Sequence, residues 1–137
     1  MNKIKSITIG QQYAYFKRQF PKWKLSFKMN KFTAIGTIQP NYAMAIYSIK
    51  IVYIIGKQPK IYVISPSLCR NSKNEKIPHI YSETKPCLYY PKFKEWTDKK
   101  YIADTIVGWC SLWLFFYESW HITGEWSGEG INHQGTK

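Results

Sequence analysis

Residues 77–96 read IPHIYSETKPCLYYPKFKEW, and this stretch contains one histidine, His79, and one cysteine, Cys87. Three prolines interrupt the stretch: Pro78, Pro86 and Pro91. Proline lacks a backbone N–H and disfavours helical geometry in the residue before it, so a regular helix is excluded and an extended loop is predicted. A cysteine in such a loop is placed for access rather than for filling a core. Cys87 is therefore the first candidate for chemistry.

The segment that follows this loop predicts a long helix. Asp104 and Thr105 offer an N-cap, and the helix is expected to run to about Trp120. Apolar residues recur at spacings of four, three, four, three and four, which predicts one buried face: Ile102, Ile106, Trp109, Trp113, Phe116 and Trp120. Such a face needs a sheet to pack on. Polar and small residues interrupt the apolar run, so we expect no membrane crossing.

Four strand candidates precede the loop, at residues 22–29, 32–38, 43–55 and 61–64. Two of them alternate with a period of two. The first would place Trp23, Leu25, Phe27 and Met29 on one face, and the third Ala45, Tyr47, Ile49, Ile51, Tyr53 and Ile55. Short connections between consecutive strands favour an antiparallel meander.

An amphipathic helix is expected before these strands, within residues 4–19. Its apolar side would carry Ile9, Tyr13 and Phe16 or Phe20. Gly10 and neighbouring β-branched residues weaken the first part, so the firm portion is expected from Gln11 to Gln19, before Pro21. The predicted fold class is α/β in the α+β sense: an N-terminal helix, a four-stranded antiparallel meander and a C-terminal helix packed on the sheet.

Length and composition predict a single domain over residues 1–137, with a loosely packed glycine-rich tail from about residue 123. Apolar residues make up 45% of the chain, which argues against disorder. Three cysteines without a short pair do not make a disulfide framework, so a reducing, cytoplasmic setting is expected. The apolar run at the start stops at Gly10, so no secretory signal is expected.

The net charge of +12 is unevenly distributed along the chain. Residues 1–74 hold thirteen basic residues and no acidic one, whereas residues 75–137 hold seven basic and eight acidic residues. One interpretation is a solvated lysine-rich surface. The other is a basic surface that steers an acidic partner, with protein placed before nucleic acid because no lysine and arginine run is interleaved with aromatics.

The three cysteines differ in their expected roles. A free cysteine is usually a small buried hydrophobe, and Cys110, inside the aromatic helix, is expected to be core. Cys69 lies in a polar loop and suggests no role. The loop and proline flanks of Cys87 favour an exposed nucleophile that attacks a carbonyl or forms a thioester once deprotonated.

His79 leaves more than one interpretation open. It would either meet Cys87 across a tight loop or hold the loop through a hydrogen bond to a backbone carbonyl. A zinc site built from Cys69, His79, Cys87 and Cys110 is a further alternative, although these residues lack a short ligand pair. No catalytic triad, phosphate-binding loop or paired carboxylates stand out, so we expect no metal and no cofactor.

The order of these features resembles the ubiquitin-conjugating enzyme fold. In that family a His-Pro-Asn motif precedes the catalytic cysteine, which a tryptophan follows; here Pro78-His79 precedes Cys87 and Trp96 follows it. The chain looks most similar to the stand-alone ubiquitin-conjugating-like proteins of short type II CBASS anti-phage operons. The residues that carry this resemblance lie in short stretches within residues 35–130: Ile77–Tyr81, Cys87–Tyr90, Ala103–Val107, Trp113-Leu114, Tyr117–Trp120 and Thr123–Gly128.

The resemblance implies a cysteine transferase in which Cys87 and His79 are catalytic, with Tyr81 and Tyr89 as candidate supporting residues. Its partner would be the cyclic-oligonucleotide synthase of the same operon, whose carboxyl terminus forms a thioester and is passed to an amine. The alternatives are a non-catalytic scaffold of the same fold that regulates the synthase, and a basic nucleic-acid-binding module. The family's oxyanion-stabilising asparagine is absent, so His79 or a backbone amide would have to replace its donor.

Overall fold

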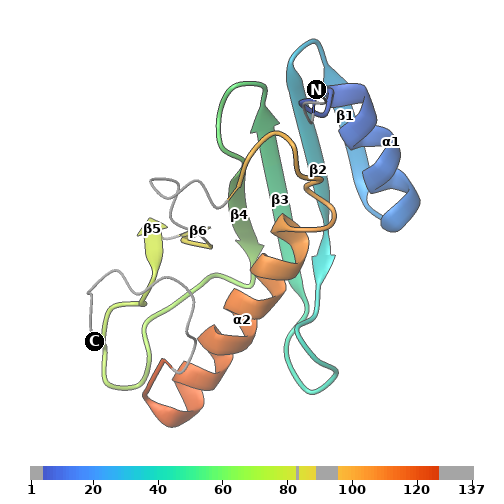
Figure 1. The fold of residues 1–137 in the computed structure, drawn as a ribbon. Helices are drawn as coiled ribbons and strands as arrows, with labels where there is room; N and C mark the ends of the chain where they lie inside the picture. The colour runs from blue at the N-terminus through green and yellow to red at the C-terminus, as the bar shows by residue number, and fades with distance from the viewer. Residues whose placement is uncertain (1–4, 83, 89–95, 127–137) are drawn as a thin grey trace.

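The computed structural model describes residues 5–82, 84–88 and 96–126. The elements in chain order are α1 (Ile9–Gln19), β1 (Lys24–Lys28), β2 (Lys31–Ile38), β3 (Tyr47–Ile54), β4 (Lys60–Ser65), β5 (Ile80–Ser82), β6 (Lys85–Pro86) and α2 (Ile106–Thr123). β1 to β4 form one antiparallel sheet in sequence order, and β5 and β6 form a separate hairpin (Figure 1). The predicted α+β class, with a helix at each end of a four-stranded meander, is confirmed.

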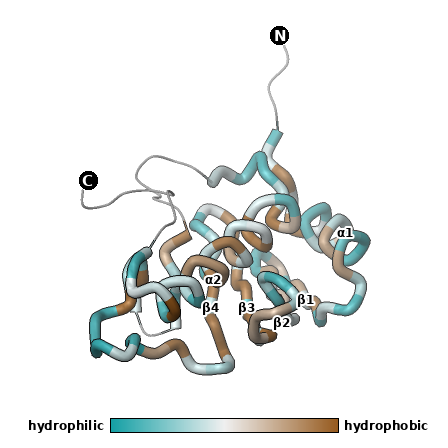
Figure 2. Tube along the Cα trace, turned by 90° about the horizontal axis from the view of Figure 1, so that it is seen from below, coloured by the Kyte–Doolittle hydropathy of each residue, from teal (hydrophilic) through white to brown (hydrophobic). Residues whose placement is uncertain are grey.

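One face of the sheet carries the core. The alternation predicted for the third strand buries four side chains of β3: Tyr47, Ile49, Ile51 and Tyr53. Phe32 of β2 pairs with Tyr53 and joins the same face. Figure 2 shows hydrophobic residues concentrated on β3, β4 and α2.

Both helices pack against this face of the sheet. In α1 the ring of Phe16 lies 5.6 Å from that of Phe32, and in α2 the ring of Tyr117 lies 6.5 Å from that of Tyr47. Buried residues of both helices belong to the same hydrophobic cluster as the strands. The predicted contact between the C-terminal helix and the sheet is therefore present (Figure 1).

Helix α1 begins at Ile9 rather than at Gln11, where its firm portion was expected. The Thr8 side chain accepts a hydrogen bond from the Gln11 N–H, and Gln11 Oε1 accepts one from the Thr8 N–H, which is a complete capping box. These bonds satisfy two backbone donors and offset the low helix propensity of Gly10. The helix ends before Pro21, as predicted.

Two strands are shorter than predicted. Met29 ends the alternation of the first strand, but it lies in the turn between β1 and β2 with φ of 55° and is 88% exposed. Ala45 was assigned to the third strand, yet it lies before β3, and its N–H donates to Glu118 Oε2 at 2.9 Å. The Tyr47 hydroxyl donates to the same oxygen at 2.7 Å, and burial together with this bond raises the pKa of Tyr47. These bonds hold the β2–β3 connection against α2.

Helix α2 begins after Thr105, as expected, but Thr105 makes no side-chain cap. Its hydroxyl instead donates to the Tyr101 carbonyl and accepts from Trp96 Nε1. The helix runs three residues beyond Trp120 and ends at Gly124, whose positive φ of 83° suits glycine. The fully buried face differs from the predicted stripe, because Trp109 and Phe116 are only partly buried. It comprises Ile106, Val107, Cys110, Trp113, Leu114, Tyr117 and Trp120.

The proline-interrupted stretch is not helical where it is described, but it is more ordered than the predicted extended loop. Residues 80–82 and 85–86 pair as β5 and β6, with Ile80 opposite Pro86 and Ser82 opposite Lys85. The Val63 N–H donates to the Thr84 carbonyl at 2.8 Å, so the hairpin turn is tied to β4. Pro86 ends β6, and Cys87 follows it directly.

Candidate functional site around Cys87

Cys87 is positioned by the backbone of the β5–β6 hairpin. Its N–H donates to the His79 carbonyl at 2.9 Å, which closes the base of the hairpin. The side chain is half-buried, in contrast to the exposed Cys69 and the buried Cys110. The thiol is thus placed on a fixed backbone without being enclosed in the core, as expected for an accessible nucleophile.

The carbonyl of His79 connects this hairpin to helix α2. It accepts the Cys87 N–H and also the indole N–H of Trp113, at 2.9 Å. His79 has φ of 52°, a backbone conformation that residues other than glycine rarely adopt. Such a conformation persists where surrounding bonds hold it, and here two donors converge on the His79 carbonyl. The Trp113 indole therefore anchors the segment that carries Cys87.

The imidazole of His79 lies against aromatic rings. Its centroid is 5.3 Å from that of Trp126, which in turn lies 5.3 Å from Trp113 and 6.2 Å from Phe116. Both predicted arrangements of His79 used its side chain, whereas the contact with Cys87 across the hairpin is made by the His79 backbone carbonyl.

Cys110 and Cys69 lie in surroundings unlike that of Cys87. Cys110 is fully buried in α2, as predicted, and burial raises the pKa of its thiol to about 12. Cys69 lies in the loop after β4, where its N–H donates to the Tyr117 hydroxyl at 2.8 Å and its carbonyl oxygen lies 3.1 Å from Nε2 of His121. Within residues 5–82, 84–88 and 96–126, no three His, Cys, Asp or Glu side chains gather as a metal site.

The structure describes one of the two tyrosines proposed to support the site. Tyr81 lies on β5, and its side chain is 60% exposed. Tyr89 lies outside the described residues.

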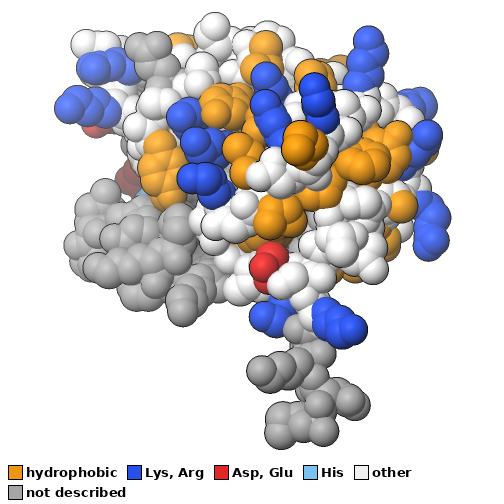
Figure 3. Space-filling model, turned by 90° about the horizontal axis from the view of Figure 1, so that it is seen from above, with side chains coloured by type: hydrophobic (Ala, Val, Ile, Leu, Met, Phe, Trp, Pro, Cys, Tyr) orange, Lys and Arg blue, Asp and Glu red, His pale blue; other side chains and the backbone are white. Residues whose placement is uncertain are grey.

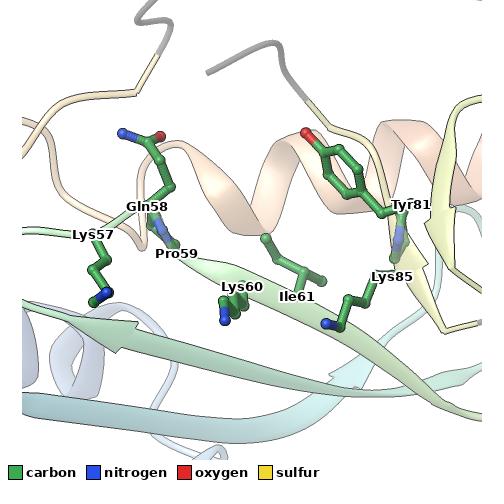
Figure 4. Close-up of a pocket in the computed structure, with 8 residues that line it drawn as sticks. Lys57, Gln58, Pro59, Lys60, Ile61, Tyr81 and Lys85 are labelled. Atoms are coloured by element: carbon green, nitrogen blue, oxygen red, sulfur yellow. The ribbon is translucent and has the colours of Figure 1, made fainter. Parts of the chain in front are cut away.

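A cavity of about 350 Å³ borders the hairpin at the edge of β4. It is lined by Lys57, Gln58, Pro59, Lys60, Ile61, Tyr81, Lys85 and Pro86. In Figure 4, Ile61 lies between Gln58 and Tyr81, and the amino groups of Lys57, Lys60 and Lys85 lie on one side. Pro86 brings the cavity next to Cys87 in the chain.

Sequence reasoning missed two features of this site. Trp113 was expected to be core, and it is 5% exposed, but its indole N–H also holds the His79 carbonyl. A buried tryptophan needs a partner for this N–H, and that requirement was the available signal. The lysines around the cavity come from the β3–β4 connection, β4 and β6, so no local motif marks them.

The site can present one thiol at the end of a hairpin that is fixed to β4 and to α2. Its described polar anchors are backbone carbonyls and an indole N–H, so they position the chain rather than transfer protons. A cysteine held in this way can act as a nucleophile once its thiol is deprotonated.

Comparison with known proteins identifies the family of the chain. No helix among the described residues combines the length and hydropathy that a bilayer crossing requires. No curated protein is similar enough to the chain to be matched with it. Residues 12–134, which include the whole of the hairpin and α2, match the family model of the type II CBASS E2 protein. The chain therefore belongs to the type II CBASS E2 protein family and is an E2-like component of CBASS.

Proposed function

We propose that this protein is a transferase that carries an acyl group on Cys87 and thereby regulates the cyclic-oligonucleotide synthase of its own operon. The acyl group is the carboxyl terminus of the synthase, and the acceptor is an amine. The observation that carries the proposal is the convergence of the Cys87 N–H and the Trp113 indole N–H on the His79 carbonyl. It fixes the backbone of a half-buried cysteine, which the resemblance to ubiquitin-conjugating enzymes makes the candidate nucleophile.

The proposed reaction has two displacement steps. The carboxyl terminus arrives activated, as a thioester or a mixed anhydride. The Cys87 thiolate attacks its carbonyl carbon, the leaving group departs with the bonding electron pair, and a new thioester forms. An amine then attacks that carbonyl, an amide forms, the amine loses a proton to solvent, and Cys87 leaves as the thiolate. Because thioester exchange is close to neutral, the main contribution of the protein is to position the partners.

His79 has two parts in this proposal. Its carbonyl holds the Cys87 backbone. The Cys87 N–H is already engaged with that carbonyl, so the His79 imidazole is the group we assign to the developing oxyanion. To reach the oxyanion, the ring would exchange its contact with Trp126 for one with substrate. Tyr81 is proposed to support the bound donor, and Tyr89 keeps the same proposed role.

Co-expression with the neighbouring synthase tests the proposal. We expect the intact mass of the protein to increase by the mass of the synthase less one water, and the adduct to be lost on thiol treatment. Cys87→Ala should abolish it, whereas Cys69→Ser, an exposed cysteine away from the hairpin, should leave it intact. An adduct that survives in Cys87→Ala, or its absence from the native pair, would favour a non-catalytic scaffold that binds the synthase.

A further inference from the structure

The cavity beside Cys87 has the features of a binding site for a peptide. We propose that it takes the acidic carboxyl-terminal segment of the acyl donor, with apolar side chains on its floor and carboxylates against its lysines. The inference rests on the proposed function, because that function delivers a protein carboxyl terminus to Cys87. It adds to that function that the selected carboxyl-terminal segment carries both acidic and apolar side chains.

The floor of the cavity is apolar. Pro59, Ile61 and Pro86 are buried, and the ring of Tyr81 stands over one side (Figure 4). Apolar surface of this kind is covered favourably by an aliphatic or aromatic side chain. A ligand with charged groups alone would leave this apolar floor exposed to water.

The rim of the cavity is basic. Lys57, Lys60 and Lys85 contribute three cations, and none of the eight described lining residues is acidic. The first 74 residues of the chain contain no acidic side chain that would neutralise this edge of the sheet. In Figure 3, lysine and arginine side chains lie among hydrophobic ones over the visible face, and acidic side chains are few. Carboxylates of a peptide are the complementary charge.

The position of the cavity favours a donor peptide. Pro86 lines it, and Cys87 is the next residue, about 3.8 Å further along the Cα trace. An extended peptide advances about 3.3 Å per residue. A donor that approached Cys87 along Pro86 would place the few residues before its last one in the cavity.

A nucleic acid fits the same lining less well. Binding to single strands uses aromatic platforms on which successive bases stack, together with a basic groove. Among the described lining residues, Tyr81 alone is aromatic. A complex with a nucleic acid would not use the apolar floor or the nearby Cys87, whereas a donor peptide would use both.

The test measures binding of unactivated peptides to the full-length protein. The probe is a fluorescein-labelled peptide of about ten residues that alternates glutamate and leucine and ends in a free carboxylate. We expect fluorescence anisotropy to report saturable binding. Replacing every glutamate by glutamine, or reversing the charge of Lys57, Lys60 and Lys85 to Glu, should weaken it about tenfold or more.

A matched variant separates the cavity from net charge. Reversing Lys22, Lys24 and Lys28 to Glu changes the charge by the same amount on exposed residues at the β1 edge. Three strand spacings, about 14 Å, separate β1 from β4. This exceeds the Debye length of about 8 Å at physiological ionic strength, so we expect the affinity to change by less than about twofold. Circular dichroism would confirm that both triple variants are folded.

The outcomes distinguish this inference from the proposed function. Equal weakening by both triple variants, or tighter binding of a single-stranded oligonucleotide than of the peptide, would overturn the cavity assignment. If peptide binding is unaffected by the cavity variant while the Cys87-dependent adduct still forms, the inference fails and the proposed function stands. If the cavity lysines control peptide binding but the native pair forms no adduct, the transferase fails and the peptide site stands.

Discussion

Cys110 and Cys87 lie in two regions of the molecule that hold their residues in different ways. Cys110 is enclosed where α2 packs on the sheet, and it is 0% exposed. Cys87 lies at the end of a hairpin whose base is closed by its own N–H. Hydrogen bonds from Val63 and Trp113 to backbone carbonyls join this hairpin to the rest of the fold. Burial holds the first thiol and suppresses its chemistry, whereas directional bonds place the second and leave it half-buried. The same residue type is thus held by packing in one region and by backbone hydrogen bonds in the other.

Alkylation should separate the two regions most widely. Burial raises the pKa of Cys110 to about 12, so the thiol stays protonated until the pH approaches that value. At about pH 8 the thiolate fraction of Cys110 is then roughly a thousandfold below that of an ordinary cysteine with pKa near 8.5. Peptide mapping after iodoacetamide treatment should find Cys110 unmodified in the folded protein and modified in guanidinium. Rapid modification of Cys110 in the folded protein would contradict its enclosure between α2 and the sheet.

Trp113 belongs to both regions, and removing it should affect both. Trp113→Ala deletes a buried indole and leaves a cavity, which should cost about 3–5 kcal/mol of unfolding free energy. Urea denaturation followed by circular dichroism measures this loss. Leu112→Ala is a matched control on the same helix, because Leu112 is 54% exposed and should cost much less. A similar loss in both variants would contradict the packing described for α2.

His79→Ala separates the carbonyl of His79 from its imidazole. The variant keeps the carbonyl that holds Cys87 but removes the proposed oxyanion donor, so thioester formation should slow by about 10²–10³-fold. The rate of adduct formation in a time course with the purified pair is the measurement, and a thermal melt serves as the control for folding. An unchanged rate would show that His79 acts through its backbone alone.

Trp113→Phe should have the smallest effect and gives the sharpest distinction. The change keeps most of the aromatic packing and removes the indole N–H that donates to the His79 carbonyl. Because that carbonyl retains the Cys87 donor, the cost in unfolding free energy should be about 1 kcal/mol. We expect adduct formation to fall more than this stability loss explains, since the anchor of the hairpin is gone. A proportionate decrease in both would mean that Trp113 only packs.

Much of the fold could be predicted because its determinants are local. The period-two pattern of β3, the proline after α1 and the apolar spacing in α2 each depend on neighbours in the sequence. One error arose where a distant contact decides: Ala45 leaves the strand pattern because its N–H bonds to Glu118. The other arose at a local turn. Met29 continues the alternation in sequence, yet a two-residue turn takes it out of the strand.

The residues proposed for the site could be named from the sequence, but the contacts that position them could not. Loop setting and proline flanks pointed to Cys87, and the resemblance added His79. The bond from Trp113 to His79 joins residues 34 positions apart, so no spacing rule reveals it. The hairpin turn docks on β4 through Thr84 and Val63, and this docking brings Lys85 to the cavity that Lys57 and Lys60 also line.

The central claim, that Cys87 carries the acyl group, is tested most directly by changing sulfur to oxygen. Co-purified complexes of the native protein and of Cys87→Ser would be compared by intact mass before and after thiol treatment. A thioester on Cys87 predicts a thiol-labile adduct in the native protein and a thiol-resistant oxygen ester in the variant. An adduct that remains thiol-labile in Cys87→Ser would place the linkage on another residue and contradict the account.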